Sequence, residues 1–137
     1  MTVRILVVDD HPVVRRGLRT LLSGRPEWKV IDEAEDGIEA VDKANSLKPD
    51  VIILDVSMPR MGGLEACRRI RKNVPESEIL IVTQHDSAQM MQEAMSAGAR
   101  GYVVKSNVAR DLPAAVEAVS QHQSFTSLKT GAAGSSN

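Results

Sequence analysis

Acidic, hydroxyl and ammonium side chains stand at the ends of four separate, largely apolar runs in this sequence. Asp9 and Asp10 follow VRILVV, Asp55 follows VIIL, Thr83 follows ILIV and Lys105 follows GYVV. Short runs of large and β-branched apolar residues are typical of strands buried in a parallel sheet. The carboxyl ends of parallel strands share one edge, where open α/β folds bind their ligands. We therefore expect these side chains to lie on one rim.

Three of these side chains are carboxylates, and their chemistry depends on a counter-ion. Like charges a few ångströms apart repel by roughly 1 kcal/mol or more per pair, even where solvent screens them. A cation would offset this repulsion, and ligands that are all oxygen favour a hard ion, Mg²⁺ or Mn²⁺. With that ion bound, one carboxylate can attack phosphorus while Thr83 and Lys105 hold other oxygens of the phosphoryl group. The pattern therefore predicts a phosphoryl-transfer site.

The elements that would position this site are strands that alternate with helices. We expect strands at residues 3–8, 28–34, 51–54, 79–82 and 101–104. The spacing of apolar residues predicts helices at about residues 11–23, 37–47, 64–73, 86–98 and 108–119. Consecutive strands joined by single helices run parallel with right-handed crossovers. The fold class is predicted as α/β: a doubly wound five-stranded parallel sheet, (βα)5, in the flavodoxin-like order 2-1-3-4-5.

That strand order makes the first and third strands neighbours at the point where the order reverses. Asp9, Asp10 and Asp55 would then converge. Taken alone, Asp9 and Asp10 would be better explained as the N-terminal cap of a helix, favoured by the helix dipole. The matching positions of Asp55, Thr83 and Lys105 favour the catalytic interpretation.

Helix ends carry further predictions. Asp86 is predicted as the N-cap of the fourth helix and Gly98 as its left-handed stop. Pro113 predicts a kink or a late start in the last helix. The cluster formed by Arg15, Arg16 and Arg19 is interpreted as a solvated helix face, with partner recognition as the alternative.

Length and composition limit the class of protein. The chain has 137 residues, 17 of them basic and 18 acidic, and a net charge of -1, which suits one ordinary domain. A single Trp, Tyr and Phe offer few stacking groups, so this chain alone is not expected to bind nucleic acid. No apolar run reaches about 18 residues, so we expect no membrane association and a cytoplasmic location. The lone Cys67 fits a reducing compartment.

Two units are predicted along the chain: a domain at residues 1–122 and a flexible linker or tail at residues 123–137. The second is rich in Ser, Thr, Gly and Ala and has little apolar content. Such a composition favours a mobile segment over a packed one.

Four segments together resemble a known family. DDHPVVRRGLRTLL, LDVSMPRMGG, ILIVT and AMSAGARGYVVKS resemble the marks of the receiver domain of two-component response regulators. The first and last of them are similar to the NarL/FixJ (LuxR-type) transcription-factor subgroup. The resemblance covers about residues 3–122. It implies that a sensor histidine kinase donates a phosphoryl group to Asp55.

The resemblance also implies a set of metal ligands. Asp10, Asp55 and the main-chain carbonyl of Ser57 would ligate Mg²⁺, with Asp9 acting largely through water. The Ser57 side chain flanks the same site and is expected to influence how fast water attacks the acyl phosphate.

Residues of the last two strands would complete the site. By resemblance, Thr83 and Lys105 contact the phosphoryl group. Tyr102 stands at the switch position, where it would turn inward as Thr83 moves toward the phosphate. Gln84 is bulky and is expected to slow phosphorylation by small donors such as acetyl phosphate. His85 is expected to tune the lifetime of the phosphorylated state.

The implied function is signalling. Phosphorylation would change conformation and self-association, giving a homodimer that controls a transcriptional output domain. The subgroup carries a helix-turn-helix domain after the receiver, so DNA would be bound only through a C-terminal domain that this sequence does not include. The protein would catalyse its own phosphorylation and slow dephosphorylation without being a turnover enzyme.

Three alternatives remain at this level. A haloacid-dehalogenase-like phosphatase also combines Asp, Mg²⁺, Thr and Lys, but its DxD signature is missing after the first strand. A binding module that is never phosphorylated would not need every one of these acids. Flavin binding of the flavodoxin type is the third alternative, but no Ser/Thr-rich phosphate loop follows the first strand.

His11 and His85 near the rim suggest a softer metal pair as an alternative set of ligands. The hard oxygen ligands at the same place make this the weaker interpretation.

Overall fold

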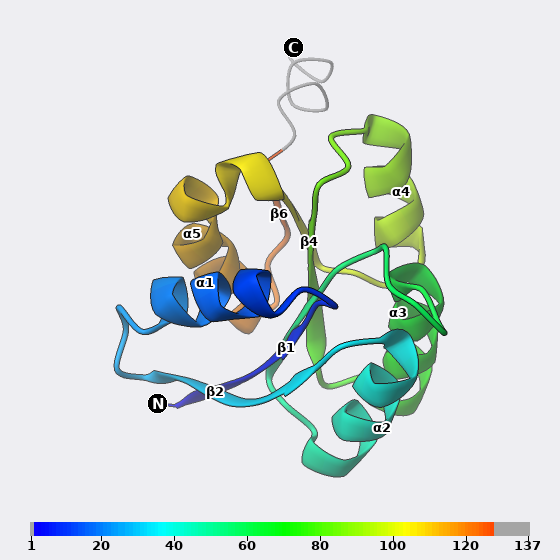
Figure 1. Cartoon of the computed structure of the whole chain (residues 1–137), viewed down its shortest axis with the longest axis horizontal. Coiled ribbons are helices and arrows are strands. Elements are labelled where there is room, and N and C mark those ends of the chain that lie inside the picture. The colour runs from blue at the N-terminus through cyan, green and yellow to red at the C-terminus, as the bar shows by residue number, and fades with distance from the viewer. Residues whose placement is uncertain (1, 128–137) are drawn as a thin grey trace.

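The computed structural model describes residues 2–127 (Figure 1). Its strands are β1 (Val3–Val8), β2 (Trp28–Ala34), β3 (Val51–Leu54), β4 (Glu78–Thr83), β5 (Gly101–Val104) and β6 (Phe125–Thr126). Its helices are α1 (Pro12–Leu22), α2 (Gly37–Leu47), α3 (Gly63–Asn73), α4 (Ala88–Ser96) and α5 (Val108–Ser120), with a 3-10 turn η1 (Lys105–Asn107) before α5. Within the described range, no helix has the length and apolar character needed to cross a bilayer.

All strand pairs are parallel, and the sheet order is β2-β1-β3-β4-β5-β6. The predicted doubly wound α/β fold with order 2-1-3-4-5 is therefore confirmed, and β6 extends it at one edge. Val8 pairs with Leu54 across β1 and β3. The Asp9 N–H donates to Ala34 O at 3.1 Å, and the Asp55 N–H donates to Val8 O at 3.2 Å. Asp9 and Asp55 thus lie next to each other, directly after the ends of β1 and β3.

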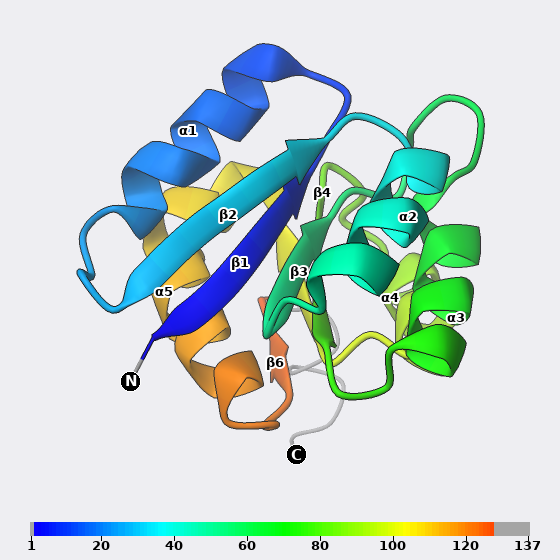
Figure 2. The same ribbon diagram turned by 90° about the horizontal axis from the view of Figure 1, so that it is seen from below.

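The strands are apolar along most of their length because helices cover both faces of the sheet. Figure 2 shows α1 and α5 on one face and α2, α3 and α4 on the other. Leu6 and Val8 of β1 pack in the core under α2, α3 and α4, whereas Ile5 and Val7 pack under α1 and α5. Alternate residues of one strand therefore enter two cores, which explains the continuous apolar runs.

The short strand β6 differs from the prediction. The sequence placed it in the tail at residues 123–137, because two strand residues leave no periodic pattern. The structure pairs it with β5. Ser127 fixes its end: the Ser127 N–H donates to Tyr102 O at 3.0 Å, and Ser127 Oγ accepts from the Val104 N–H at 3.0 Å. The rest of the predicted tail, residues 128–137, lies outside the described residues.

Helix ends correct two expectations. The N-cap of α4 is Ser87 rather than Asp86, and its side chain accepts a hydrogen bond from the main-chain N–H three residues later at 3.2 Å. Both residue types cap well, so the sequence alone could not choose between them. Gly98 has a φ of 115° after α4, as predicted. Helix α5 begins at Val108 and continues through Pro113, so of the two predicted effects the late start is wrong and the kink stays a prediction.

Candidate functional site

The carboxyl ends of β1 and β3 bring three acids together. Asp9 and Asp55 follow these strands directly and are almost fully buried, at 1% and 4% exposed. Asp10 and His11 join them in a group whose potential ligand atoms all lie within 4.8 Å of one another. The predicted convergence of Asp9, Asp10 and Asp55, called the acidic cluster below, is therefore confirmed. His85 is not part of this group.

A lysine at the end of β5 reaches the acidic cluster. Lys105 Nζ lies 2.8 Å from Asp9 Oδ2 and 3.2 Å from Asp55 Oδ2. Partial burial lowers the pKa of Lys105, but its hydrogen bonds to the two carboxylates and their negative charges together raise that pKa above its ordinary value. Lys105 therefore stays an ammonium at neutral pH and offsets part of the negative charge.

The loop after Asp55 is fixed by a close main-chain approach. The Val56 N–H donates to Asp55 Oδ1 at 2.7 Å, and the Gly63 N–H donates to Val56 O at 2.8 Å. A Cβ on Gly63 would lie 2.0 Å from the Asp55 carbonyl oxygen. Only glycine fits there without moving the main chain, so Gly63 sets how closely α3 approaches the site.

Asp10 supplies the observation that bears on a metal ion. Its Oδ1 is buried and accepts no hydrogen bond from the residues that the structure describes, although His11 Nδ1 lies 3.0 Å away. A buried carboxylate oxygen without a donor is costly. A divalent cation with oxygen ligands would remove that cost. The acidic cluster is consistent with a metal site.

The ends of β4 and β5 carry the hydroxyl groups of the site. Thr83 is buried and pairs with Val104, the residue before Lys105, so it lies on the same rim. Tyr102 is fully buried, and its hydroxyl donates to His85 O at 2.6 Å. Burial raises the pKa of Tyr102 to about 12, with smaller contributions from nearby carboxylates. The tyrosine ring thus already points inward in this structure.

The three residues expected to modulate the site lie on its outer side. Ser57 is exposed, and its Oγ lies 3.1 Å from His85 Nε2. The His85 N–H donates to Thr83 Oγ1 at 3.5 Å. Gln84 is exposed in the turn between them. The loop after β3 and the loop after β4 are therefore in contact beside the site, through Ser57 and His85.

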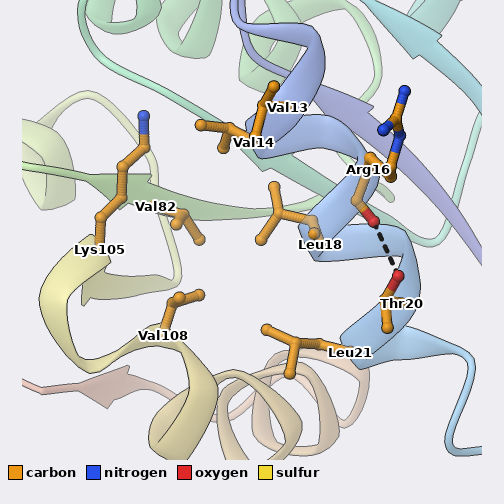
Figure 3. Close-up of a pocket in the computed structure, with 10 residues that line it drawn as sticks. Val13, Val14, Arg16, Leu18, Thr20, Leu21, Val82, Lys105 and Val108 are labelled. Carbon is orange, nitrogen blue, oxygen red and sulfur yellow. Dashed lines mark hydrogen bonds between the residues drawn. The ribbon is translucent and has the colours of Figure 1, made fainter.

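An apolar groove of about 600 Å³ opens between α1 and α5. Most of its lining comes from α1, joined by one residue each of β4, η1 and the start of α5: Val13, Val14, Arg16, Gly17, Leu18, Thr20, Leu21, Val82, Lys105 and Val108. Figure 3 shows Leu18, Val82 and Val108 around the space and Lys105 at its edge. No sequence pattern indicates this groove, because the residues that join α1 in lining it come from β4, η1 and α5, which lie far from α1 along the chain.

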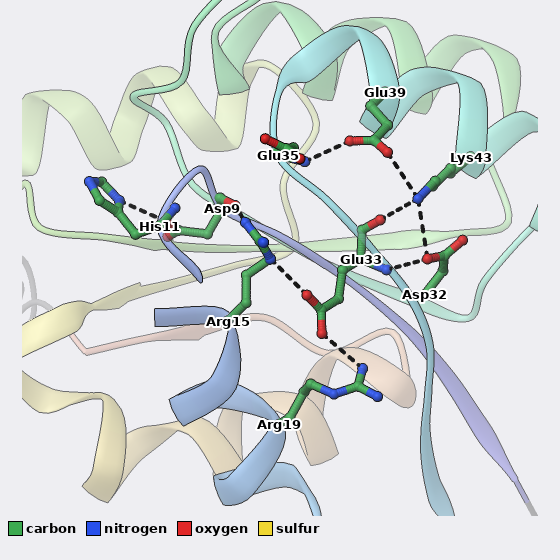
Figure 4. Close-up of polar contacts among 9 residues, drawn as sticks. All are labelled: Asp9, His11, Arg15, Arg19, Asp32, Glu33, Glu35, Glu39 and Lys43. Carbon is green, nitrogen blue, oxygen red and sulfur yellow. Dashed lines mark hydrogen bonds and ion pairs between the residues drawn. The ribbon is translucent and has the colours of Figure 1, made fainter. Parts of the chain in front are cut away.

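The structure corrects the interpretation of Arg15 as part of a solvated helix face. Its side chain is only 15% exposed. Arg15 Nη1 donates to the main-chain carbonyl of Asp9 at 2.6 Å, and Nε contacts Glu33 Oε1 at 2.7 Å (Figure 4). Sequence spacing places Arg15 on the first predicted helix but does not show that its guanidinium turns toward the end of the first strand.

Comparison with known proteins identifies the family. The family model described as the response regulator receiver domain matches residues 5–117. The chain therefore belongs to the response regulator receiver family, and the family resemblance of its sequence motifs is confirmed.

The relatives belong to the same class. The chain is 40% identical over 131 residues to the DNA-binding transcriptional activator DevR/DosR of Mycobacterium tuberculosis, a match covering 96% of this chain and 60% of that protein. It is 37% identical over 124 residues to the response regulator protein VraR of Staphylococcus aureus, covering 90% and 59%. The crystal structure of a LuxR-family two-component response regulator from Aurantimonas sp. has a TM-score of 0.87 and 40% identity, covering 91% of this chain and 89% of that one. The chain thus spans about 60% of the length of these curated relatives.

Proposed function

We propose that Asp55 of this receiver domain accepts a phosphoryl group from a sensor histidine kinase. One oxygen of the Asp55 carboxylate bonds to phosphorus while the bond from phosphorus to the imidazole nitrogen breaks. The imidazole leaves with the electron pair of that bond and takes up a proton. The observation that carries this proposal is the nearly buried Asp55 with Lys105 Nζ 3.2 Å from its Oδ2. A cation held there can stabilise the charge that develops on the phosphoryl oxygens.

The acidic cluster is proposed to hold Mg²⁺, or Mn²⁺ in its place. Asp10, Asp55 and the main-chain carbonyl of Ser57 would be its ligands, and Asp9 would act largely through water. When bound, the ion supplies positive charge that reduces repulsion between the carboxylates and the incoming phosphate. Support comes from the buried Asp10 Oδ1, which lacks a donor among residues 2–127.

Lys105 and Thr83 are proposed to contact the transferred group. The two carboxylates Asp9 and Asp10 with a dianionic phosphoryl group carry about -4 of charge, against +2 from the metal ion and +1 from Lys105. Lys105 would keep its contact with Asp9 while it turns toward a phosphoryl oxygen. The Thr83 hydroxyl would donate to another of these oxygens, which draws Thr83 toward Asp55.

The groove between α1 and α5 is proposed to contact the kinase. The donor histidine has to reach Asp55, so the kinase must cover the rim that carries Lys105. The groove adjoins this rim and exposes apolar surface, and Val13 in its lining is 76% exposed. Exposed apolar patches of this kind mark interaction sites.

Signalling is proposed to pass from Thr83 on β4 to Tyr102 on the neighbouring strand β5. This change would alter self-association, favour a homodimer and control a transcriptional output domain. The relative DevR/DosR is described as a DNA-binding transcriptional activator, and DNA binding here would require such a further domain. We expect the protein in the cytoplasm.

Incubation with Mg²⁺ and a phosphoramidate, followed by intact-mass measurement, tests this function. We expect a single phosphoryl group per chain, no addition when Mg²⁺ is chelated, and none in Asp55→Asn. Addition that is unaffected by the Asp55→Asn change would contradict the proposal.

The same reaction distinguishes a receiver domain from the phosphatase alternative. A receiver domain is expected to release phosphate slowly after one round of labelling. Steady release of many equivalents of phosphate per chain would instead favour a haloacid-dehalogenase-like phosphatase.

A further inference from the structure

We propose that Arg15 is a positioning residue for the metal ligand Asp10. It fixes the peptide plane between Asp9 and Asp10, and so the direction in which the Asp10 carboxylate points. This inference rests on the proposed Mg²⁺ site and names a residue of α1 that sets its geometry.

The contacts of Arg15 reach the main chain of the site. Its Nη1 donates to the Asp9 carbonyl oxygen at 2.6 Å, and its Nε donates to Glu33 Oε1 at 2.7 Å. Figure 4 shows the guanidinium lying between the end of β1 and the Glu33 side chain on β2. The Asp9 carbonyl and the Asp10 amide belong to one planar peptide unit. A donor that fixes the Asp9 carbonyl therefore also fixes the plane of the peptide unit that carries the Asp10 amide.

Asp10 depends on this main-chain restraint because its carboxylate has little other support. Its Oδ1 is buried and accepts no hydrogen bond within residues 2–127, and the His11 Nδ1 that lies 3.0 Å away belongs to a side chain that is 63% exposed. The preceding residue, in contrast, is held on both sides. The Asp9 N–H donates to Ala34 O at 3.1 Å, and the Asp9 carbonyl accepts from Arg15. The direction of the Asp10 side chain is thus set through Asp9.

Glu33 on strand β2 holds the Arg15 guanidinium in place. Its second oxygen, Oε2, lies 3.1 Å from Arg19 Nη1, and its main-chain carbonyl accepts from Lys43 Nζ at 2.5 Å. Residues from α1 and α2 therefore hold Glu33 in place. A guanidinium that donates to two fixed acceptors has few alternative orientations. Because Glu33 holds the Arg15 guanidinium, the guanidinium in turn restrains the peptide unit between Asp9 and Asp10.

Arg19 offers a matched control on the same helix. It pairs with the same glutamate as Arg15, but its side chain is 46% exposed, and in the described structure it does not donate to Asp9. Arg15→Gln and Arg19→Gln each remove one positive charge from α1. They differ in whether the donor to the Asp9 carbonyl is lost.

The direction of the change in Mg²⁺ affinity distinguishes a positioning role of Arg15 from a purely electrostatic one. Removal of a cation near the acidic cluster would strengthen Mg²⁺ binding by Coulomb's law alone. Loss of the peptide restraint would weaken binding, because the Asp10 carboxylate would lose its set direction. Changes to groups that orient metal ligands typically weaken metal binding by roughly 10-fold to 100-fold.

Titration calorimetry with Mg²⁺ alone is the direct test. We expect Arg15→Gln to raise the dissociation constant by roughly 10-fold, and Arg19→Gln to leave it unchanged or slightly lower. Arg15→Lys keeps the charge and one donor and is expected to recover part of the affinity. At saturating Mg²⁺, the rate of phosphorylation of Arg15→Gln should return to within about 2-fold of the unsubstituted protein, since Asp55 and Lys105 are unaltered.

An affinity of Arg15→Gln for Mg²⁺ that equals or exceeds that of Arg19→Gln would overturn the inference alone. Lack of any Mg²⁺ binding by the unsubstituted protein would contradict the proposed function together with it. Should Arg15→Gln fail to fold, the comparison of Arg15→Lys with Arg19→Lys decides the question, and equal affinities of that pair would overturn the inference.

Discussion

At the scale of single residues, the site joins groups that would be unstable apart. Asp9 and Asp55 are nearly buried carboxylates on neighbouring strands, and Lys105 is the cation that touches both. A buried charge that loses its partner is strongly destabilising, whereas an exposed charge is not. Lys105 is therefore expected to contribute to stability as well as to phosphoryl transfer.

Replacement of Lys105 tests this double role. Lys105→Met should lower the free energy of unfolding in Mg²⁺-free buffer by about 2 kcal/mol, because the two carboxylates then repel without compensation. Added Mg²⁺ should restore more stability to this variant than to the unsubstituted protein. Urea denaturation measures both effects, with the exposed Lys29→Met as the control. Equal losses in the two variants would count against the assigned role.

The single tyrosine gives a pH-dependent prediction. Burial raises the pKa of Tyr102 to about 12, so the unfolded chain ionises first as the pH rises. Stability from this group is therefore complete below about pH 10, the ordinary pKa of tyrosine, and falls between there and the raised folded value. Ultraviolet titration of the folded protein reports Tyr102 alone and should give a midpoint well above that of free tyrosine. A midpoint near pH 10 would show that the ring is not buried as described.

At the scale of elements, the sequence predicted the strands that carry the site from their short continuous apolar runs, and the helices from apolar residues at helical spacing. The β1, β2, β3 and β5 boundaries agree with those expected, and β4 is longer by one residue at each end. The strand β6 was missed because its stability comes from pairing with β5 and from the Ser127 hydrogen bonds, which are contacts between distant segments.

The same limit applies to the candidate site. Residues at strand ends could be predicted, since topology alone brings Asp9, Asp10 and Asp55 together. Arg15 could not, because a helix pattern shows which residues are polar but not which of them turns toward a neighbouring strand. The assigned roles of Ser57, Gln84 and the switch pair remain predictions.

Two glycines allow a test of the loop that carries Asp55. In Gly63→Ala the new Cβ would meet the Asp55 carbonyl oxygen, so the loop has to move and Mg²⁺ binding and phosphorylation should fall together. Around Gly17, in the middle of α1, no described atom beyond its chain neighbours and the adjacent helix backbone lies within 4 Å of such a Cβ. Gly17→Ala should therefore keep the phosphoramidate labelling of the unsubstituted protein and raise stability by about 0.5 to 1 kcal/mol. Thermal unfolding and phosphoramidate labelling of both variants distinguish a local clash from a general effect of added methyl groups.

At the scale of the whole molecule, two helical layers and the sheet leave one rim on which all proposed reactive groups meet. The acidic cluster, Thr83 and Lys105 come from four strand ends, and the groove between α1 and α5 opens beside them. This arrangement lets a partner approach Asp55 beside the groove, and Tyr102 of β5 is proposed to respond inside the core.

The location of the phosphoryl group is the measurement that tests the central claim most directly. After labelling with phosphoramidate and Mg²⁺, reduction with borohydride converts an aspartyl phosphate into a stable homoserine that peptide mass spectrometry can map. We predict this conversion at Asp55 and at no other acid, and its loss when Mg²⁺ is chelated. Conversion at Asp9 or Asp10, or an unmodified Asp55 in a labelled protein, would contradict the account.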